Sequence, residues 1–213
     1  MAGNGIHLVA AAGSVRPGNF TSKALALVVD EIRKHPEVAL EVPDLASARL
    51  PFPGQAPTDD AKRIQKMISE ATGVILATPE YHGSFSSVMK LLIENLGFPS
   101  VLAGKPVALL GVAAGQIGAV KALEHLRSVC SHIGAIVLPG AVSVAGVQEL
   151  FDEQGRCLDP PTEKRIRGVA TQMLDYIHSN ICPRVALEEI VRTGSTDWMT
   201  RVAGMGRRAS RRA

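Results

Sequence analysis

Three apolar runs constrain the fold of this chain more than any other feature of its sequence. They cover residues 6–12, 73–78 and 105–112 and are rich in Val, Ile, Leu and Ala. The second run, GVILAT, carries no charge and offers aliphatic side chains to both faces of a strand. Such strands are typical of a sheet that helices cover on both sides. The runs therefore predict the buried strands of an α/β protein.

Helical patterns alternate with these strands. Thr58 is a predicted N-cap, with Asp59 and Asp60 in the first turn that follows it. Shorter strands are predicted at 38–42 and from 135 to 138, which makes five strands in all. The predicted helices cover residues 20–34, 59–71, 84–96, 119–133 and 160–178. This alternation predicts a doubly wound, five-stranded parallel sheet in a three-layer α/β/α arrangement.

Unusual residues gather in three loops that follow strands, at 13–21, 79–84 and 113–118. Ligands of doubly wound sheets bind beyond the carboxyl ends of the strands, near the point where the strand order reverses. Because all three loops lie at carboxyl ends, we expect them to contribute to one ligand site.

The first loop has the composition of an anion site. It carries Ser14, Arg16, Gly18, Asn19 and Thr21 between a buried strand and a helix. Free N–H groups and the positive end of the helix dipole favour a phosphate there, and an arginine adds planar, charged hydrogen bonds. The loop has neither the G-x-G-x-x-G fingerprint nor the Gly-Lys-Ser/Thr ending of a P-loop. The alternative is an ordinary turn, because Gly, Ser, Pro and Asn are common turn residues.

The second and third loops offer a flat surface and room for a bulky ligand. Tyr81 presents an apolar face to a planar ring, and the small residues of 113–118 let a ligand approach the backbone. Alternatively, Tyr81 is a packing residue, Glu80 is a capping or solvated acid and the third loop is a tight connection. His82 is expected to be a surface residue rather than a general base. The sequence carries no convincing signature of nucleophilic catalysis or of a metal site.

The net charge of +3 is unevenly distributed. Residues 201–213 contain five arginines and no acid, so the rest of the chain carries −2. This balance argues against nucleic acid as a partner of the folded part. Cys130, Cys157 and Cys182 are odd in number and widely spaced, which indicates free thiols in a reducing compartment. Since no apolar stretch is long enough for a membrane span and no signal-peptide pattern is present, we expect a cytoplasmic protein.

Taken together, the three loops resemble the NADPH-dependent FMN reductase family of flavodoxin-like proteins, which includes quinone, chromate and azo-dye reductases. The resemblance covers roughly residues 5–180 and rests on GSVRPGNFTSKAL, TPEYHGSFSSVMKLLIENL and GKPVALLGVAAGQIGAV. It implies a flavodoxin-like fold with bound FMN. The implied FMN contacts are Ser14, Arg16, Asn19, Phe20 and Thr21 around the phosphate; Pro79, Glu80, Tyr81, His82, Gly83 and Ser84 along the isoalloxazine and ribityl chain; and Ala113, Ala114, Gly115 and Gln116 at the other edge of the ring.

The chain departs from the family pattern at several of these positions. Asn19 and Thr21 stand where the family commonly has Ser and Asn, and His82 replaces the usual Asn. Leu96-Gly97-Phe98 replaces a segment that frequently contains Trp. These changes bear on substrate preference more than on flavin binding.

The resemblance implies an oxidoreductase whose flavin carries the chemistry, so that no catalytic side chain is required. Hydride would pass from NADPH or NADH through FMN to a small acceptor (free flavin, a quinone, chromate or an azo compound) by a ping-pong mechanism. Family members are generally dimers or tetramers that pair through the helix at 84–96. Two alternatives stay open: a flavodoxin-type electron carrier that binds FMN without oxidising NAD(P)H itself, and a flavin-fold protein without catalysis. The carrier fits less well, because the body is only mildly acidic and poor in aromatic residues.

The sequence divides into an expected FMN-binding domain at 1–180 and a C-terminal extension at 181–213. The Arg-rich end of the extension, from residue 193, is expected to be disordered. Arg207-Arg208-Ala209-Ser210 resembles a site for basic-directed kinases, although most tails of this kind are merely solvated.

Overall fold

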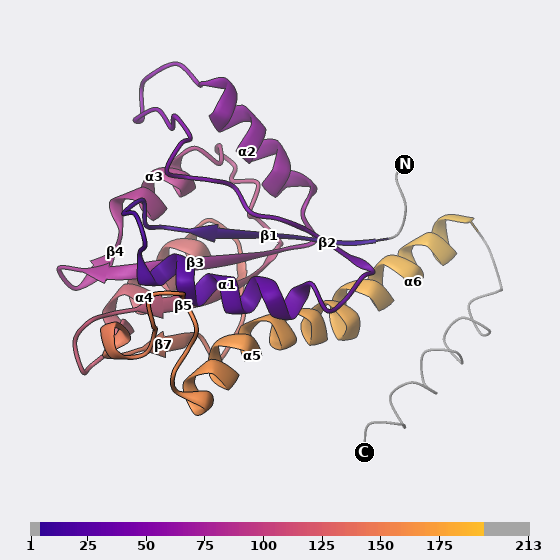
Figure 1. Cartoon of the computed structure of the whole chain (residues 1–213). Coiled ribbons are helices and arrows are strands. Elements are labelled where there is room, and N and C mark those ends of the chain that lie inside the picture. The colour runs from indigo at the N-terminus through magenta and orange to yellow at the C-terminus, as the bar shows by residue number, and fades with distance from the viewer. Residues whose placement is uncertain (1–4, 194–213) are drawn as a thin grey trace. The chain divides into compact units, whose positions relative to one another are not determined.

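A parallel sheet forms the centre of the first of two compact units, residues 1–173 and 174–213, into which the chain divides. The computed structural model describes residues 5–193. The principal strands lie in the order β2 (Val38–Glu41), β1 (Ile6–Ala12), β3 (Gly73–Tyr81), β5 (Pro106–Val112) and β6 (Ile136–Val137) (Figure 1). Each neighbouring pair is parallel. The predicted doubly wound parallel sheet is confirmed, although two short strands, β4 beside β3 and β7 beside β5, bring the number of strands to seven.

Helices cover both faces of this sheet. On one face, α2 (Asp59–Glu70), α3 (Ser87–Glu94) and α4 (Val120–His132) share an apolar cluster with alternate strand residues such as Val74 and Leu76. On the other face lie α1 (Phe20–Ile32) and α5 (Pro160–Tyr176) (Figure 1). Successive strand residues point to opposite faces, so fully buried strands must be apolar throughout. The predicted three-layer arrangement is confirmed.

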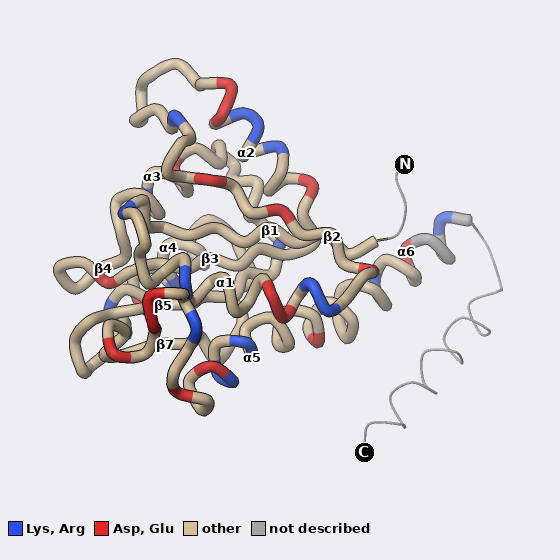
Figure 2. Tube along the Cα trace, viewed as in Figure 1, with Lys and Arg blue, Asp and Glu red and all other residues tan. Residues whose placement is uncertain are grey.

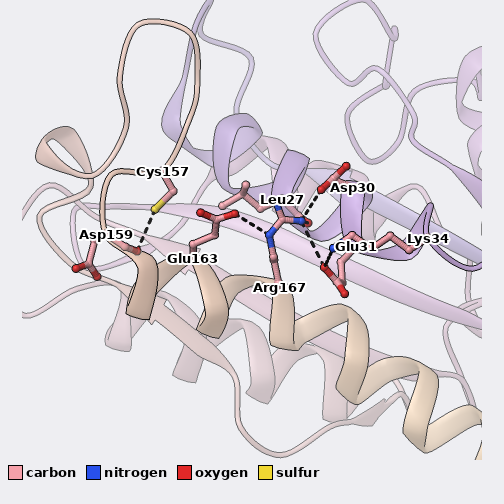
Figure 3. Close-up of polar contacts among 8 residues, drawn as sticks. All are labelled: Leu27, Asp30, Glu31, Lys34, Cys157, Asp159, Glu163 and Arg167. Atoms are coloured by element: carbon pink, nitrogen blue, oxygen red, sulfur yellow. Dashed lines mark hydrogen bonds and ion pairs between the residues drawn. The ribbon is translucent and has the colours of Figure 1, made fainter.

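Arg167 of α5 fixes the position of α1 through a network of ion pairs (Figure 3). Its guanidinium donates to Glu163 on its own helix at 2.8 Å and to Asp30 and Glu31 on α1 at 2.5 and 3.4 Å. The Arg167 hydrogen bond lowers the pKa of Asp30, and a hydrogen bond from Lys34 lowers the pKa of Glu31. Both carboxylates therefore stay ionised in neutral solution, and the link between the two helices is retained there.

Charges of both signs occupy the solvent side of the helices. Along α1 and α2, Lys and Arg are interspersed with Asp and Glu, while β1 carries neither kind of residue (Figure 2). Within residues 5–193, no helix combines the length and the apolar character that crossing a membrane requires.

The clearest difference from the sequence prediction lies at residues 79–84. The sequence predicts a loop there, whereas β3 continues to Tyr81 and turns back into an antiparallel strand, β4 (Ser84–Phe85). His82 and Gly83 form the turn with φ values of 51° and 74°. Two successive residues with positive φ make a tight hairpin. Because a histidine seldom adopts positive φ, the sequence gives no clear signal of this turn. The hairpin also delays the start of α3 from residue 84 to Ser87.

The chain after β5 contains two further differences. The fifth strand is split into β6 and β7 (Val142–Val144), both parallel to β5, and is followed by a 3₁₀ turn at Val147–Glu149. In the second unit, a π-helical segment at Ile177–Ile181 leads into α6 (Cys182–Thr193), which the sequence analysis does not predict. The predicted disorder of the Arg-rich tail and its possible kinase site concern residues 194–213, which lie outside the described part of the chain.

Candidate functional site

The carboxyl ends of β1, β3 and β5 meet at one edge of the sheet. Ala12 pairs with Ala77, and Pro79 pairs with Val112, so the three strands end at similar levels. β2 and β3 lie on opposite sides of β1, and the strand order therefore reverses next to the first loop. This is the position at which sheets of this kind bind their ligands.

Ser86 ties the first loop to the second. Its buried hydroxyl donates to the carbonyl of Gly13 and accepts from the N–H of Met89, which caps α3. The hydroxyl of Thr78 in turn accepts from the N–H of Ser86 at 3.1 Å. Gly13 is required for this approach, because a Cβ there would lie 2.9 Å from the Ser86 hydroxyl. The sequence analysis missed Ser86, because it predicted a helix from residue 84 and so placed this serine inside the helix rather than at its N-cap.

A cavity of about 510 Å³ opens beside the first loop, with Ser14, Arg16, Asn19 and Ser22 among its lining residues. Ser14 is only 8% exposed, and its hydroxyl oxygen is buried with no hydrogen-bond partner among the described residues. Leaving a buried hydroxyl unpaired costs roughly 1–3 kcal/mol. A ligand atom that bonded Ser14 would remove that cost.

Arg16 and Tyr81 come from different loops and contact each other. The guanidinium carbon of Arg16 lies 4.9 Å from the centre of the Tyr81 ring. This is the geometry of a cation–π contact, which limits the orientation of the ring. Tyr81 is 36% exposed, so part of its surface stays available at the edge of the sheet.

Three of the other residues predicted at the first loop shape the loop itself. The side chain of Asn19 caps α1 by accepting from the Ser22 N–H at 2.8 Å, and it donates to the Arg16 carbonyl at 2.7 Å. The ring of Phe20 lies 6.4 Å from that of Phe151, and Thr21 is buried in the first turn of α1. Neither Phe20 nor Thr21 lines the cavity.

The second loop is held against α4. The Glu80 carboxylate accepts from the N–H of Ala122 at 3.1 Å and so caps a helix whose own N-cap, Ala119, has no suitable side chain. Ser84 lies 3.1 Å from His125 on the same helix, measured from Oγ to Nδ1. Glu80 is therefore the capping acid that the sequence analysis kept as an alternative. Pro79 is part of β3, and the turn residues His82 and Gly83 lie at the tip of the hairpin.

The third loop presents small, exposed residues at the same edge. Ala113 is hydrogen-bonded to Val144 at 2.9 Å, and the Gly115 carbonyl accepts from the N–H of Gly118 at 3.1 Å. Ala114, Gly115 and Gln116 are exposed between these two fixed points. Gly118 has a φ of 77°, and a Cβ there would clash with the Ser143 hydroxyl, so this position needs glycine.

The other reactive groups of the described residues lie apart from one another. Within residues 5–193, no three or more His, Cys, Asp or Glu side chains are close enough together to hold a metal ion. Cys130, Cys157 and Cys182 are free thiols. Burial raises the pKa of Cys130 to about 12, so this thiol is protonated in neutral solution and acts as a packing residue.

Comparison with known proteins identifies close relatives by sequence. The profile of a family described as NADPH-dependent FMN reductase matches residues 6–149. An NAD(P)H-dependent FMN reductase of Pseudomonas aeruginosa is 30% identical over 173 residues, which cover 76% of this chain and 90% of that protein. An FMN-dependent NADPH-azoreductase of Staphylococcus aureus is 29% identical over 178 residues, covering 79% of this chain and 93% of that protein.

Solved structures agree on the fold. FerB, a flavoenzyme NAD(P)H:(acceptor) oxidoreductase from Paracoccus denitrificans, superimposes with a TM-score of 0.67 and 22% identity over 82% of this chain and 98% of its own. The family match spans more than half of the chain and includes all three loops at the carboxyl edge. The chain therefore belongs to the NADPH-dependent FMN reductase family.

Proposed function

We propose that this protein is an FMN-dependent NAD(P)H oxidoreductase. It takes hydride from NADPH or NADH and passes the electrons through FMN to a small acceptor such as free flavin, a quinone, chromate or an azo compound. The observation that carries the proposal is the buried Ser14 hydroxyl, which no described residue hydrogen-bonds and which lines a cavity together with Arg16. Membership of the family and relatives named as FMN reductase and azoreductase support it.

The residues of the first loop fit the phosphate of FMN. Ser14 offers a hydroxyl that has no hydrogen-bond partner within residues 5–193, and Arg16 offers a guanidinium suited to phosphate oxygens. Asn19 keeps the loop in shape, because its amide already bonds Arg16 and Ser22 within the loop. We therefore assign the phosphate to Ser14 and Arg16, and indirect roles to Asn19, Phe20 and Thr21.

The edge formed by the second and third loops fits a flat ring. Tyr81 would pack beside the ring, with its orientation held by Arg16. Residues 113–116 would lie along another edge, where the small side chains of Ala113 and Ala114 and the absence of one at Gly115 leave the backbone accessible. Glu80 and Ser84 would act through the position of the hairpin, since both are bonded to α4.

Bound FMN supplies the redox chemistry, accepting hydride from a pyridine nucleotide and giving electrons to a second substrate. The side chains of this protein bind and orient the reactants and exclude part of the water. No side chain has to transfer a proton for this scheme, and the two substrates use the site in turn. Ping-pong kinetics follow from that order.

Mixing the FMN-loaded protein with NADPH under anaerobic conditions tests the proposal. We expect the flavin absorbance to bleach rapidly and to return when a quinone is added, whereas free FMN at the same concentration should bleach far more slowly. An electron carrier would hold FMN but bleach no faster than the free flavin. Either that result or a protein that takes up no FMN would contradict the proposed function.

We also propose that the protein assembles as a homodimer or homotetramer. Phe98 is fully exposed and follows α3 in the sequence. Phe52 is 66% exposed and lies near Asn95, the C-cap of α3, in space. Phe52 and Asn95 line a cavity of about 230 Å³ at this place. Exposed aromatic side chains next to a hollow are typical of surfaces that a protein partner covers.

Changing Phe98 to Asp is expected to lower the mass measured by sedimentation equilibrium to that of one chain. Leu158→Asp is the matched control, because Leu158 is 62% exposed in a different part of the chain. A wild-type protein that sediments as one chain, or a Phe98→Asp variant that keeps the wild-type mass, would count against this assembly.

The three free thiols support the cytoplasm as the compartment of the protein, because thiols stay reduced there. Fractionation of cells that produce the protein would check this, and recovery outside the cytoplasmic fraction would oppose it.

A further inference from the structure

The cavity beside the first loop continues as a groove along α1. The residues of α1 that line it repeat at spacings of four, three and four and so lie on one side of the helix: Ser22, Ala26, Val29 and Arg33. From the first to the last of them the helix rises by about 16 Å. The segment that follows β2 forms the opposite wall with Pro43, Asp44 and Leu45. We call the space between these two walls the α1 groove.

The α1 groove leads away from the edge assigned to the flavin ring. Its outer wall follows β2, whereas Tyr81 ends β3 and residues 113–116 follow β5. β2 and β3 lie on opposite sides of β1. Ser14 and Arg16, which come directly after β1, stand between the two directions. A ligand that fills both must therefore extend from the flavin phosphate on the side opposite to the ring.

The α1 groove offers apolar surface to a ligand. Val15 and Val42 line the cavity and are 43% and 47% exposed, and the buried side chains of Leu25 and Val29 line it as well. At about 510 Å³ the whole cavity lies within the ~300–1,000 Å³ range of small-molecule sites and exceeds what one phosphate group fills. Apolar side chains on both walls suit the flat faces of an aromatic base.

Asp44 decides which polar group fits beside the outer wall. Its carboxylate accepts from the Ala46 N–H at 3.0 Å, but a carboxylate can accept about four hydrogen bonds and so keeps room for more. The negative charge repels a phosphate and favours hydroxyl groups, which can donate to it. In dinucleotide-binding sheets an acidic residue holds the ribose hydroxyls in this way. A sugar is therefore the group that suits this part of the groove.

Arg33 supplies hydrogen-bond donors at the far end of the groove. Its side chain makes no ion pair or hydrogen bond with the described residues, whereas Asp30 and Glu31 of the same helix are paired with Arg167. A guanidinium offers both N–H donors and a planar face. Both suit a purine base, whose ring nitrogens accept hydrogen bonds.

We propose that the α1 groove binds the adenylate half of FAD, so that the protein takes FAD as well as FMN. The phosphate next to the flavin stays on Ser14 and Arg16, and the second phosphate enters the groove past Ser22. The ribose hydroxyls donate to Asp44, and the adenine lies between the apolar walls beside Arg33. The extra half of FAD is joined to the flavin phosphate, which is the connection that the direction of the groove requires. This inference rests on the proposed function and extends the range of its cofactor.

Titrations of the flavin-free protein, followed by flavin fluorescence, test the inference without turnover. The wild-type protein should bind FAD about tenfold more tightly than FMN, the contribution of one charged hydrogen bond. Asp44→Ala should remove most of this difference and Arg33→Ala part of it, with the affinity for FMN unchanged in both. Asp59→Ala and Lys34→Ala are the matched controls, because each removes a charge of the same sign outside the groove, and both should keep the wild-type ratio.

Blocking the groove gives a second measurement. Ala26 is exposed on the side of α1 that lines the groove. Ala26→Trp should therefore fill the groove and make FAD bind no more tightly than FMN, while FMN keeps its wild-type affinity. Ala26→Leu is a milder variant if the tryptophan disturbs folding.

The FMN titration separates this inference from the proposed function. A wild-type protein that binds FMN, but binds FAD no more tightly, would overturn the inference alone. The same holds if Asp44→Ala and Ala26→Trp keep the wild-type ratio, or if Ala26→Trp weakens the binding of both flavins equally. A protein that takes up neither flavin would contradict the proposed function as well.

Discussion

Replacing Ser14 and Arg16 together by alanine is expected to weaken FMN binding by roughly a hundredfold to ten-thousandfold. Hydrogen bonds to a charged group contribute about 1.5–3 kcal/mol each, so losing two of them corresponds to about two to four decades in Kd. Fluorescence titration of the flavin with the protein from which FMN has been removed measures the change.

The same double variant should fold normally. Arg16 is exposed, and the Ser14 hydroxyl has no partner among the described residues, so its removal breaks no hydrogen bond within them. The contact of Arg16 with Tyr81 is lost, which accounts for about 0.5–1 kcal/mol at an exposed site. Arg16→Lys keeps the charge but not the planar geometry, and we expect an intermediate affinity.

A matched control replaces an arginine and a serine elsewhere. Arg63 and Ser87 are both exposed and lie on α2 and α3. Arg63→Ala with Ser87→Ala changes the net charge by the same amount and should leave the FMN affinity unchanged. If this control weakened FMN binding as much as Ser14→Ala with Arg16→Ala, the charge of the whole protein rather than the first loop would explain the effect.

Replacing Ser86 by alanine is expected to lower the free energy of unfolding by about 2–3 kcal/mol. The hydroxyl caps α3, which contributes roughly 0.5–2 kcal/mol, and its loss leaves the buried Gly13 carbonyl without that donor, at a further cost of about 1–3 kcal/mol. The two costs overlap, because one hydroxyl serves both bonds. Chemical denaturation followed by circular dichroism measures the loss.

Ser87 provides the matched control, since it is the adjacent serine and is exposed. Ser87→Ala should change the free energy of unfolding by less than about 0.5 kcal/mol. Equal stability of Ser86→Ala and Ser87→Ala would show that the link between the first loop and α3 contributes nothing to the fold.

The central sheet could be predicted well from the sequence, because each buried strand is marked by the apolar residues within its own short run. Strands buried on both faces are expected to be apolar throughout, and β5 satisfies that rule, while β1 departs from it only at the half-buried His7 and β3 at Thr78 and at Glu80 near its end. Helix α2 was also predicted correctly, since Thr58 and the two acids after it form a local N-terminal signal. The hairpin at His82-Gly83 was not predicted, because its turn depends on a conformation that a histidine seldom adopts.

The contacts that assemble the site could not be predicted from sequence, because they join residues far apart in the chain. Ser86 and Gly13 are 73 positions apart, and Glu80 and Ala122 are 42 apart. Neither residue type indicates such a partner by itself. The loop positions, in contrast, followed from the order of strands and helices, and so the edge of the sheet could be identified in advance.

The most direct test of the account compares FMN with riboflavin, which lacks the phosphate, as ligands of the same flavin-free protein. If Ser14 and Arg16 hold the phosphate, the wild-type protein should bind FMN at least a hundredfold more tightly, on the estimate of about 1.5–3 kcal/mol for each bond. The Ser14→Ala, Arg16→Ala variant should bind the two flavins with nearly equal, weak affinity. Equal affinities for FMN and riboflavin in the wild-type protein would contradict the account.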